Sequence, residues 1–359
     1  MEDERLGEHS HEAKGMAITP GQTLSINVML TAAEPGKVDG GPEEATAIET
    51  RDLSKRYPGG VLAVDGLSLQ IRKGEVFGFL GPNGAGKTTS IRMMVGLLRP
   101  TSGEVLIEGE EIRTASRRTK RNIGLCPQDI VVWGRLTCME NLLVIADMYE
   151  VPRATARERS EKLLDDLKLS EKKDVLADNL SGGMKRRLNV AMALVHDPEI
   201  VVMDEPTAGL DPQSRLVVTE HISRLKETKK VTVILTTHEM DVADHLSDRI
   251  AIIDRGKLQV LDTPENLKDS IGEGDIMEMA LSEEAKNAGA VEALRNVKGI
   301  ENVNEVRGRV AVRALDAAGR LPEILGLLER MGVKVSDVSI RRNSLEDVFI
   351  ALTGRGLRE

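Results

Sequence analysis

The sequence predicts an α/β fold built on a mostly parallel sheet, with an antiparallel β region, a helical insertion and a smaller α+β domain at its end. Short apolar strands alternate with helical segments between about residues 46 and 272, which is typical of a parallel sheet. A glycine-rich turn directly follows one buried strand. The stretch from 137 to about 196 shows only helical periodicity, so it is assigned to an insertion.

The regular pattern begins near Thr46. Alternating apolar positions predict an antiparallel strand region at Val61, Val64, Leu67, Leu69 and Ile71. The continuous apolar run 76–80 predicts a buried strand, and the glycine-rich turn after it leads into a helix expected at 88–98. Within the insertion, helices are expected at 139–149, 154–169 and 181–196.

Strands expected at 199–203, 231–235 and 250–253, with a helix from Pro212 onward, complete the parallel core. A terminal helix and linker at 264–272 follow. The remainder shows a β-α-β-β-α-β order, with segments at 276–281, 283–297, 303–306, 309–314, 321–331 and 333–340. That order is typical of a ferredoxin-like domain. Ser344 and Asp347 have the spacing of a capping box that opens a last helix.

These patterns divide the chain into an extension over 1–45, a main domain over 46–272 and an accessory domain over 273–359. The extension is acidic: residues 1–46 contain nine acidic and three basic residues and so carry −6 of the net charge of −9. Its composition predicts disorder, with a short docking segment as the alternative.

Composition excludes several classes of protein. No run approaches the roughly 20 apolar residues of a membrane helix, so a membrane role would need another polypeptide. The body is nearly neutral and has no basic stripe, which argues against a nucleic-acid partner. The N-terminus does not resemble a secretory signal. The two cysteines, Cys126 and Cys138, are expected to be small buried residues in a reducing compartment, which predicts a cytosolic protein.

The glycine-rich turn fits the phosphate-loop pattern G-x-x-x-x-G-K-[ST], with the required strand before it and helix after it. Its residues are Gly81, Pro82, Asn83, Gly84, Ala85, Gly86, Lys87, Thr88 and Thr89. Glycines let successive N–H groups point at phosphate oxygens beside a helix N-terminus. Lys87 would span the β- and γ-phosphates of ATP, and the Thr88 hydroxyl would ligate Mg²⁺. The strand–loop–helix context argues against a chance glycine-rich turn.

The strand at 199–203 ends in two carboxylates, Asp204 and Glu205. Asp204 would hold Mg²⁺ through water, and Glu205 would act as general base for the attacking water. Without the phosphate loop, a solvated strand end would be the better interpretation.

Ser181, Gly182 and Gly183 open a helix and predict a second anion site. One nucleotide does not need two γ-phosphate sites in one chain. This site is therefore expected to complete the pocket of a second subunit, in a head-to-tail pair that buries two ATP. A plain helix N-cap at Ser181 is the alternative.

Together with Gln128, Asp211 and His238, these motifs stand in the order and spacing of the ATP-binding cassette (ABC) ATPases, a resemblance that covers roughly 47–270. The resemblance implies that Gln128 contacts Mg²⁺ and the water, and that Asp211 reaches across the dimer. It also implies that His238 holds the γ-phosphate and orients Glu205, and that Tyr57 stacks on adenine. Met184 stands where many members carry Gln, which resembles a subgroup that powers drug, lipid and polysaccharide export.

The segment 344–355 is similar to the tail of antibiotic-resistance and sodium-export ATPases of the ABC-2 type. This resemblance implies an ATPase that powers a separate integral-membrane permease as an exporter and is held at the cytoplasmic face through it. A second nucleotide-binding subunit is expected, identical or different. Soluble cassette ATPases that act on DNA, ribosomes or cluster assembly, and importer ATPases, are the alternatives. The transported substrate stays open.

Overall fold

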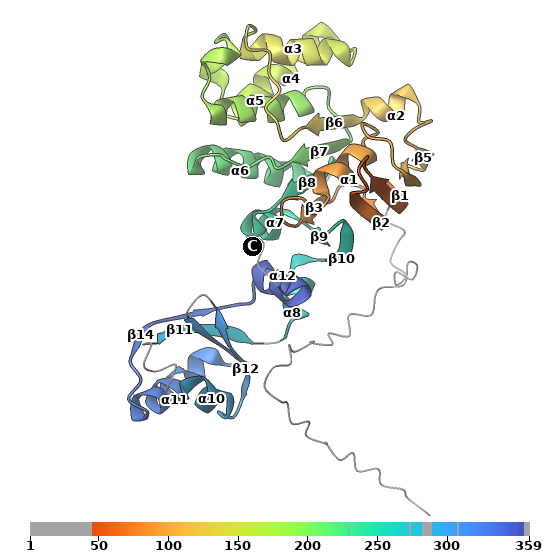
Figure 1. The fold of residues 1–359 in the computed structure, drawn as a ribbon. Helices are drawn as coiled ribbons and strands as arrows, with labels where there is room; N and C mark the ends of the chain where they lie inside the picture. The colour runs from red at the N-terminus through yellow and green to blue at the C-terminus, as the bar shows by residue number, and fades with distance from the viewer. Residues whose placement is uncertain (1–44, 229, 273, 282–288, 307–308, 355–359) are drawn as a thin grey trace, which may run out of the picture. The chain divides into compact units, whose positions relative to one another are not determined.

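The computed structural model describes residues 45–354 except 229, 273, 282–288 and 307–308 (Figure 1). Apart from Ala45, the predicted N-terminal extension lies outside the described residues. The described chain is mixed α/β, with one largely parallel sheet and two antiparallel sheets.

The central sheet has six strands in the order β10-β9-β3-β8-β7-β6, and only β10 runs antiparallel to its neighbour. Three of its strands are buried along their whole length, as expected for a parallel sheet covered on both faces. The prediction of a mostly parallel core is confirmed. The strands are β3 (Val76–Leu80), β6 (Ile123–Cys126), β7 (Ile200–Asp204), β8 (Thr232–Thr237), β9 (Arg249–Asp254) and β10 (Lys257–Asp262).

The predicted antiparallel region forms a four-stranded sheet in the order β2-β1-β4-β5. Its strands are β1 (Thr46–Arg56), β2 (Leu62–Arg72), β4 (Ser102–Ile107) and β5 (Glu110–Glu111). Apolar residues from this sheet share one core with helix α1 (Lys87–Met94) and the central sheet, including Ile48, Leu67, Phe77 and Met93. This core fixes the strand that precedes the phosphate loop and the helix that follows it.

Helix α1 is shorter than predicted: it ends at Met94, whereas the sequence predicts a helix that continues to 98. Gly96 has a φ of +74°, in the left-handed region that ends helices. A Cβ at that position would lie 3.0 Å from Ile112 Cγ1, so the helix ends where the turn after Glu111 comes close to it.

The helical insertion consists of α3 (Cys138–Met148), α4 (Arg153–Asp166) and α5 (Gly182–Leu194), which contact one another (Figure 1). Helix α3 begins at a capping box formed by Thr137 and Glu140. Apolar residues of the three helices form a core with one face of the central sheet. Cys126 and Cys138 are both fully buried and unpaired, as predicted.

The remaining elements of the main domain are α2 (Arg117–Arg121), α6 (Pro212–Thr228), α7 (Met240–Leu246) and α8 (Pro264–Asp269). Within the described residues, no helix combines the length and the apolar character that crossing a bilayer requires.

The C-terminal elements follow the β-α-β-β-α-β order predicted for a ferredoxin-like domain, in an antiparallel sheet of order β12-β13-β11-β14. They are β11 (Asp275–Leu281), α10 (Ala290–Arg295), β12 (Ile300–Val306), β13 (Arg309–Ala314), α11 (Ala317–Arg330) and β14 (Val335–Arg341). Part of the helix predicted at 283–297 lies outside the described residues. This sheet has its own core, which includes Met277, Val312 and Leu328.

The last helix, α12 (Leu345–Thr353), begins at the predicted capping box of Ser344 and Asp347. Its apolar residues pack against α7, α8 and the central sheet, where Phe349 and Val348 share a core with Leu80 and Leu267. Burial alone would raise the pKa of Asp347, but hydrogen bonds from Arg341 and Ser344 lower it. Helix α12 therefore packs against the main domain.

A half-buried histidine, His196, is expected to make the stability of this fold depend on pH. The ring of His196 stacks on Tyr149 with centroids 3.7 Å apart, and its Nε2 lies 3.2 Å from Ile123 O. Burial lowers the pKa of His196 to about 4. Because the unfolded chain protonates His196 near pH 6.5, its contribution to stability is present above about pH 6.5 and is lost as the pH falls toward 4.

We therefore expect His196→Gln to reduce acid sensitivity. Between pH 7.5 and 5.0, the wild-type free energy of unfolding should fall by about 2 kcal/mol more than that of the variant. Urea titrations at both pH values measure the difference. The exposed residue His245 provides the control, since His245→Gln should behave like wild type. Equal acid losses in His196→Gln and wild type would contradict the assignment.

Candidate functional site

The predicted catalytic side chains meet at one edge of the central sheet. Strands β3, β8 and β7 are neighbours and parallel, so the segments that leave their carboxyl ends lie side by side. These ends carry Gly81, His238 and the pair Asp204 and Glu205. The phosphate loop and the two carboxylates, more than a hundred residues apart in sequence, thus share one site.

The phosphate loop has the backbone geometry that its glycines allow. Gly84 and Gly86 have φ angles of +81° and +106°. A Cβ at Gly86 would lie 2.4 Å from Ala63 O, whereas Gly84 meets nothing within 4 Å and faces open space. The loop runs directly into the N-terminus of α1, which favours an anion. Nucleotide phosphates therefore fit this turn.

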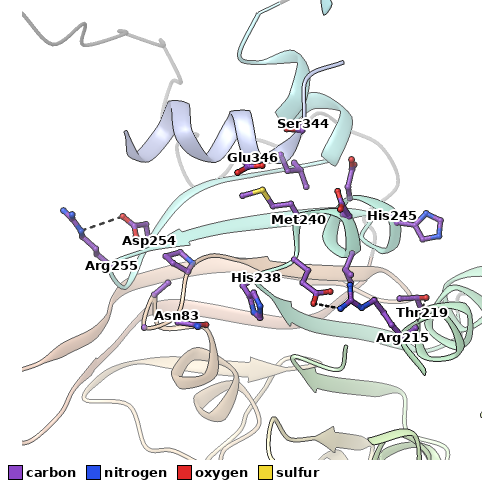
Figure 2. Close-up of a pocket in the computed structure, with 18 of the residues that line it drawn as sticks. Asn83, Arg215, Thr219, His238, Met240, His245, Asp254, Arg255, Ser344 and Glu346 are labelled. Atoms are coloured by element: carbon purple, nitrogen blue, oxygen red, sulfur yellow. Dashed lines mark hydrogen bonds and ion pairs between the residues drawn. The ribbon is translucent and has the colours of Figure 1, made fainter. Parts of the chain in front are cut away.

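The loop borders a cavity of about 1410 Å³. Figure 2 shows Asn83 and His238 on one side of it and Ser344 and Glu346 of the α12 segment on the other. Arg215 also lines the cavity, 3.4 Å from Glu239. The cavity thus adjoins the phosphate loop on the side of Asn83, whereas Lys87, Asp204 and Glu205 do not line it.

Lys87 is buried, with 5% of its side chain exposed. Its Nζ donates to Gly81 O at 2.6 Å and Pro82 O at 3.0 Å, and it lies 3.7 Å from Glu205 Oε1. Burial lowers the pKa of Lys87, while the negative charges of Glu205 and Asp204 oppose that shift. The ammonium group thus stands inside the phosphate loop, held by carbonyl oxygens that a phosphate could replace.

Asp204 is 3% exposed and accepts two hydroxyl hydrogen bonds on one oxygen. Thr88 Oγ1 lies 3.2 Å from Asp204 Oδ1, and Thr236 Oγ1 lies 2.6 Å from it. A hydroxyl and a carboxylate oxygen this close together are ligands that suit Mg²⁺, which completes its shell with phosphate and water. The donor set therefore fits the ion that the sequence predicts.

Glu205 adopts a left-handed backbone conformation, with a φ of +48° that is uncommon for a residue other than glycine. Its N–H donates to Thr236 Oγ1 at 2.9 Å. Its Oε1 lies 3.2 Å from His238 Nδ1, without the alignment of a hydrogen bond. The buried carboxylate therefore stands between a lysine and a partly exposed imidazole, a position from which it could accept a proton from water.

Tyr57 follows β1 and reaches the end of the phosphate loop. Its hydroxyl lies 3.5 Å from Thr89 Oγ1, and Lys55 Nζ lies 5.6 Å from its ring centroid. With 36% of the residue exposed, the ring is accessible beside the loop. This placement is compatible with stacking on a nucleotide base.

Other predicted residues form a second cluster. A Cβ on Gly183 would lie 2.4 Å from Ser214 Oγ, and Asp211 Oδ1 accepts from Ser214 N at 2.9 Å. That hydrogen bond lowers the pKa of Asp211. Ser181 Oγ caps α5 by accepting from Met184 N. Among the described residues, no hydrogen bond or ion pair joins this cluster to the phosphate loop. The side chain of Gln128 is exposed and likewise makes no hydrogen bond to the phosphate loop within the described chain.

Comparison with known proteins decides the family. The sequence profile described as "ABC transporter" matches residues 64–208. The linearmycin resistance ATP-binding protein LnrL of Bacillus subtilis is 35% identical over 87% of this chain and 100% of its own length. The chain belongs to the ABC transporter family. The daunorubicin/doxorubicin resistance ATP-binding protein DrrA of Streptomyces peucetius is 38% identical over 86% of this chain and 92% of its own length.

A solved structure agrees with this assignment. The dimeric structure of an ATP-binding cassette in a post-hydrolysis state, bound to ADP and Pi, is 26% identical with a TM-score of 0.55. The match covers 60% of this chain and 98% of the cassette. The predicted family, P-loop fold and ATPase class are confirmed. This chain is therefore an ATP-binding subunit of the ABC transporter family.

Two residues that contact the ABC ATPase site were not predicted. Thr236 bonds both carboxylate residues, and Arg186 donates to the carbonyls of Asp204 and Glu205. A signal existed for each, since Thr236 is a polar residue in an apolar strand and Arg186 adjoins a recognised motif. Neither residue type indicates which groups it binds, because Asp204 and Glu205 are distant from both in sequence.

We expect Thr236→Val to lower both stability and turnover. The variant leaves the buried N–H of Glu205 without an acceptor, which costs about 1–3 kcal/mol, and releases Asp204 from one hydroxyl. ATP turnover should fall by roughly tenfold or more, because the carboxylates lose their fixed position. Urea denaturation and a phosphate-release assay measure the two effects. Thr236→Ser keeps the hydroxyl and should stay near wild type; a Val variant indistinguishable from Ser would refute this role.

Proposed function

We propose that this chain is the motor subunit of an ABC exporter, in which two copies close around two Mg²⁺·ATP and drive a separate membrane permease. The observation that carries the proposal is the contact of Glu205 with Lys87 and His238 at the phosphate loop. That arrangement places a buried base, a cation and an imidazole where the γ-phosphate would bind.

Each residue has a distinct part in the proposed reaction. Lys87 exchanges the carbonyls of Gly81 and Pro82 for β- and γ-phosphate oxygens, and the N-terminus of α1 adds positive potential. Glu205 accepts a proton from the attacking water, and His238 holds that carboxylate and the γ-phosphate in place. Tyr57 stacks on the adenine.

Thr88 and Asp204 are the residues that would hold Mg²⁺, together with Gln128 once that side chain turns inward. When bound, the ion neutralises the charge that develops on the phosphates. Hydrogen bonds from Thr236 and Thr88 hold the Asp204 oxygen in place beside the loop.

The second cluster supports a pair of subunits. Ser181, Gly182 and Gly183 open the 13-residue helix α5, whose N-terminus suits a phosphate. Ser181 and Gly182 are exposed, and Asp211 lies beside them near the opening of α6. A second copy, turned head to tail, would bring this exposed turn to the phosphate loop, and we propose a homodimer of that form.

An apolar cleft is the proposed docking site for the permease. A cavity of about 640 Å³ lies between the end of α1 and the end of α3, lined by residues that include Leu97, Leu98 and Tyr149. Leu97, which lines the cleft, is 65% exposed, and Met148, the last residue of α3, is equally exposed. Large apolar side chains this exposed are typical of a protein-binding surface. A cytoplasmic segment of the permease, seated in this cleft, would hold the subunit at the inner face of the membrane.

Export follows from the relatives. LnrL and DrrA are named for resistance to linearmycin and to daunorubicin/doxorubicin. A transporter subunit that protects a cell against a compound works in the outward direction. We propose that the cargo is a compound to which export gives resistance, selected by the permease.

The Glu205→Gln variant tests the motor. Without the base, ATP turnover should fall by roughly 10²- to 10⁴-fold, while nucleotide affinity stays near wild type. The stalled variant should accumulate as an ATP-loaded dimer in size-exclusion chromatography with Mg²⁺·ATP. A variant that turns over ATP at the wild-type rate as a monomer would refute both the base and the two-subunit site.

Lys87→Ala is the complementary change, because it removes the cation and should abolish nucleotide binding and dimerisation together. Lys162→Ala removes an exposed lysine on α4 and serves as the matched control. Retained nucleotide affinity in Lys87→Ala would count against the phosphate loop as the binding site.

The permease is tested by isolating tagged Glu205→Gln protein with ATP from detergent-solubilised native membranes. We expect a polytopic membrane protein to co-purify, and Leu97→Glu to abolish its recovery while ATP affinity stays unchanged. Leu315→Glu changes a leucine that is 60% exposed in the C-terminal domain and should retain the permease. Recovery of ribosomes or nucleic acid in place of a membrane protein would assign the motor a different load.

A further inference from the structure

The guanidinium of Arg186 is buried against the backbone of the proposed catalytic residues Asp204 and Glu205. Arg186 lies on α5, one turn after the Ser181–Gly183 motif, and only 2% of the residue is exposed. It donates five hydrogen bonds, one from Nε and two from each Nη. That number equals the N–H groups of a guanidinium, so the whole donor set is used.

The five acceptors are backbone carbonyls of two segments. Pro127 and Gln128 accept from Nη1 at 2.5 and 3.0 Å. Asp204 and Glu205 each accept from Nη2 at 2.7 Å, and Pro206 accepts from Nε at 3.1 Å. The two segments leave the carboxyl ends of β6 and β7, which pair in parallel. One side chain thus joins the segment of Gln128 to the segment of the two carboxylates.

Arg186 also completes the restraint on the backbone of Glu205. The N–H of Glu205 is held by Thr236, and its carbonyl is held by Arg186. These two bonds fix the peptide groups on both sides of a residue with a φ of +48°. Because that conformation is unfavourable for glutamate, it persists only where neighbours hold it.

We propose that Arg186 is a positioning residue, through which helix α5 and the segment of Gln128 set the place of the Glu205 carboxylate. This proposal rests on the proposed role of Glu205 in ATP hydrolysis. Within the described chain, none of the hydrogen bonds of the Arg186 side chain goes to the phosphate loop or to Lys87, so we expect its loss to affect the position of Glu205 more than nucleotide affinity. Only the planar, forked guanidinium of arginine can bind both segments at once. A lysine ammonium has its three donors around one nitrogen and cannot reach the carbonyls of both segments.

Purified full-length Arg186→Lys and Arg186→Gln proteins test this proposal. We expect kcat for ATP hydrolysis to fall at least tenfold in both, with KM and the Kd of a fluorescent ATP analogue within threefold of wild type. Arg187→Lys is the matched control, since Arg187 is the next residue of α5 and donates to the carbonyls of Leu167 and Lys168, within the insertion. Its kcat should stay within twofold of wild type.

Two results would overturn the proposal: an unchanged kcat in Arg186→Lys, or equal losses of kcat, nucleotide affinity and thermal midpoint in every folded variant, which would indicate general support of the fold. If Arg186→Gln does not fold, Arg186→Lys decides alone. A wild-type protein without ATPase activity would instead refute the proposed function.

Discussion

A lysine and two carboxylates are buried together at the carboxyl edge of the central sheet, and much of the chain keeps them there. Taking such charges out of water costs several kcal/mol each unless neighbouring charges and hydrogen bonds compensate. Lys87 is compensated by two carbonyls and by Glu205, and Asp204 by two hydroxyls. The two carbonyls follow β3, Glu205 follows β7, and the two hydroxyls come from α1 and β8. The site can therefore form only when these strands are neighbours in the sheet.

The compensation also indicates how Lys87 and Asp204 would receive a nucleotide and its cation with little change in their own positions. Phosphate oxygens would replace the carbonyls at Lys87, and a cation would replace the hydroxyl hydrogens at Asp204, at positions already oriented. Preorganised charges of this kind stabilise developing charge without reorganisation during the reaction. The strained backbone of Glu205, which costs about 1–3 kcal/mol, is maintained by bonds on both sides of the residue.

The sequence predicted the features whose causes are local. The phosphate loop is contiguous, and the apolar strands 76–80 and 199–203 agree with β3 and β7 to within one residue. The partners of Arg186 could not be predicted, because 127–128 and 204–206 meet only through the pairing of β6 with β7. The early end of α1 had a local signal in Gly96, which takes the left-handed conformation that ends helices. The packing of α12 on α7 and α8, in contrast, depends on contacts between separate parts of the chain.

The same geometry connects the phosphate loop to the proposed docking cleft. Helix α1 begins at Lys87 and ends at Met94, and the cleft begins with the residues that follow it. Eight helical residues span about 12 Å, and α1 packs in one core with the central sheet. In the proposed motor, α1 is therefore the shortest connection between the phosphate loop and Leu97. Strand β6 offers a second connection, because Ile123 and Leu125 line the cleft and Arg186 joins the segment after β6 to Glu205. The phosphate loop and the proposed docking cleft thus lie at opposite ends of one short helix, an arrangement that the proposed coupling of ATP hydrolysis to a permease requires.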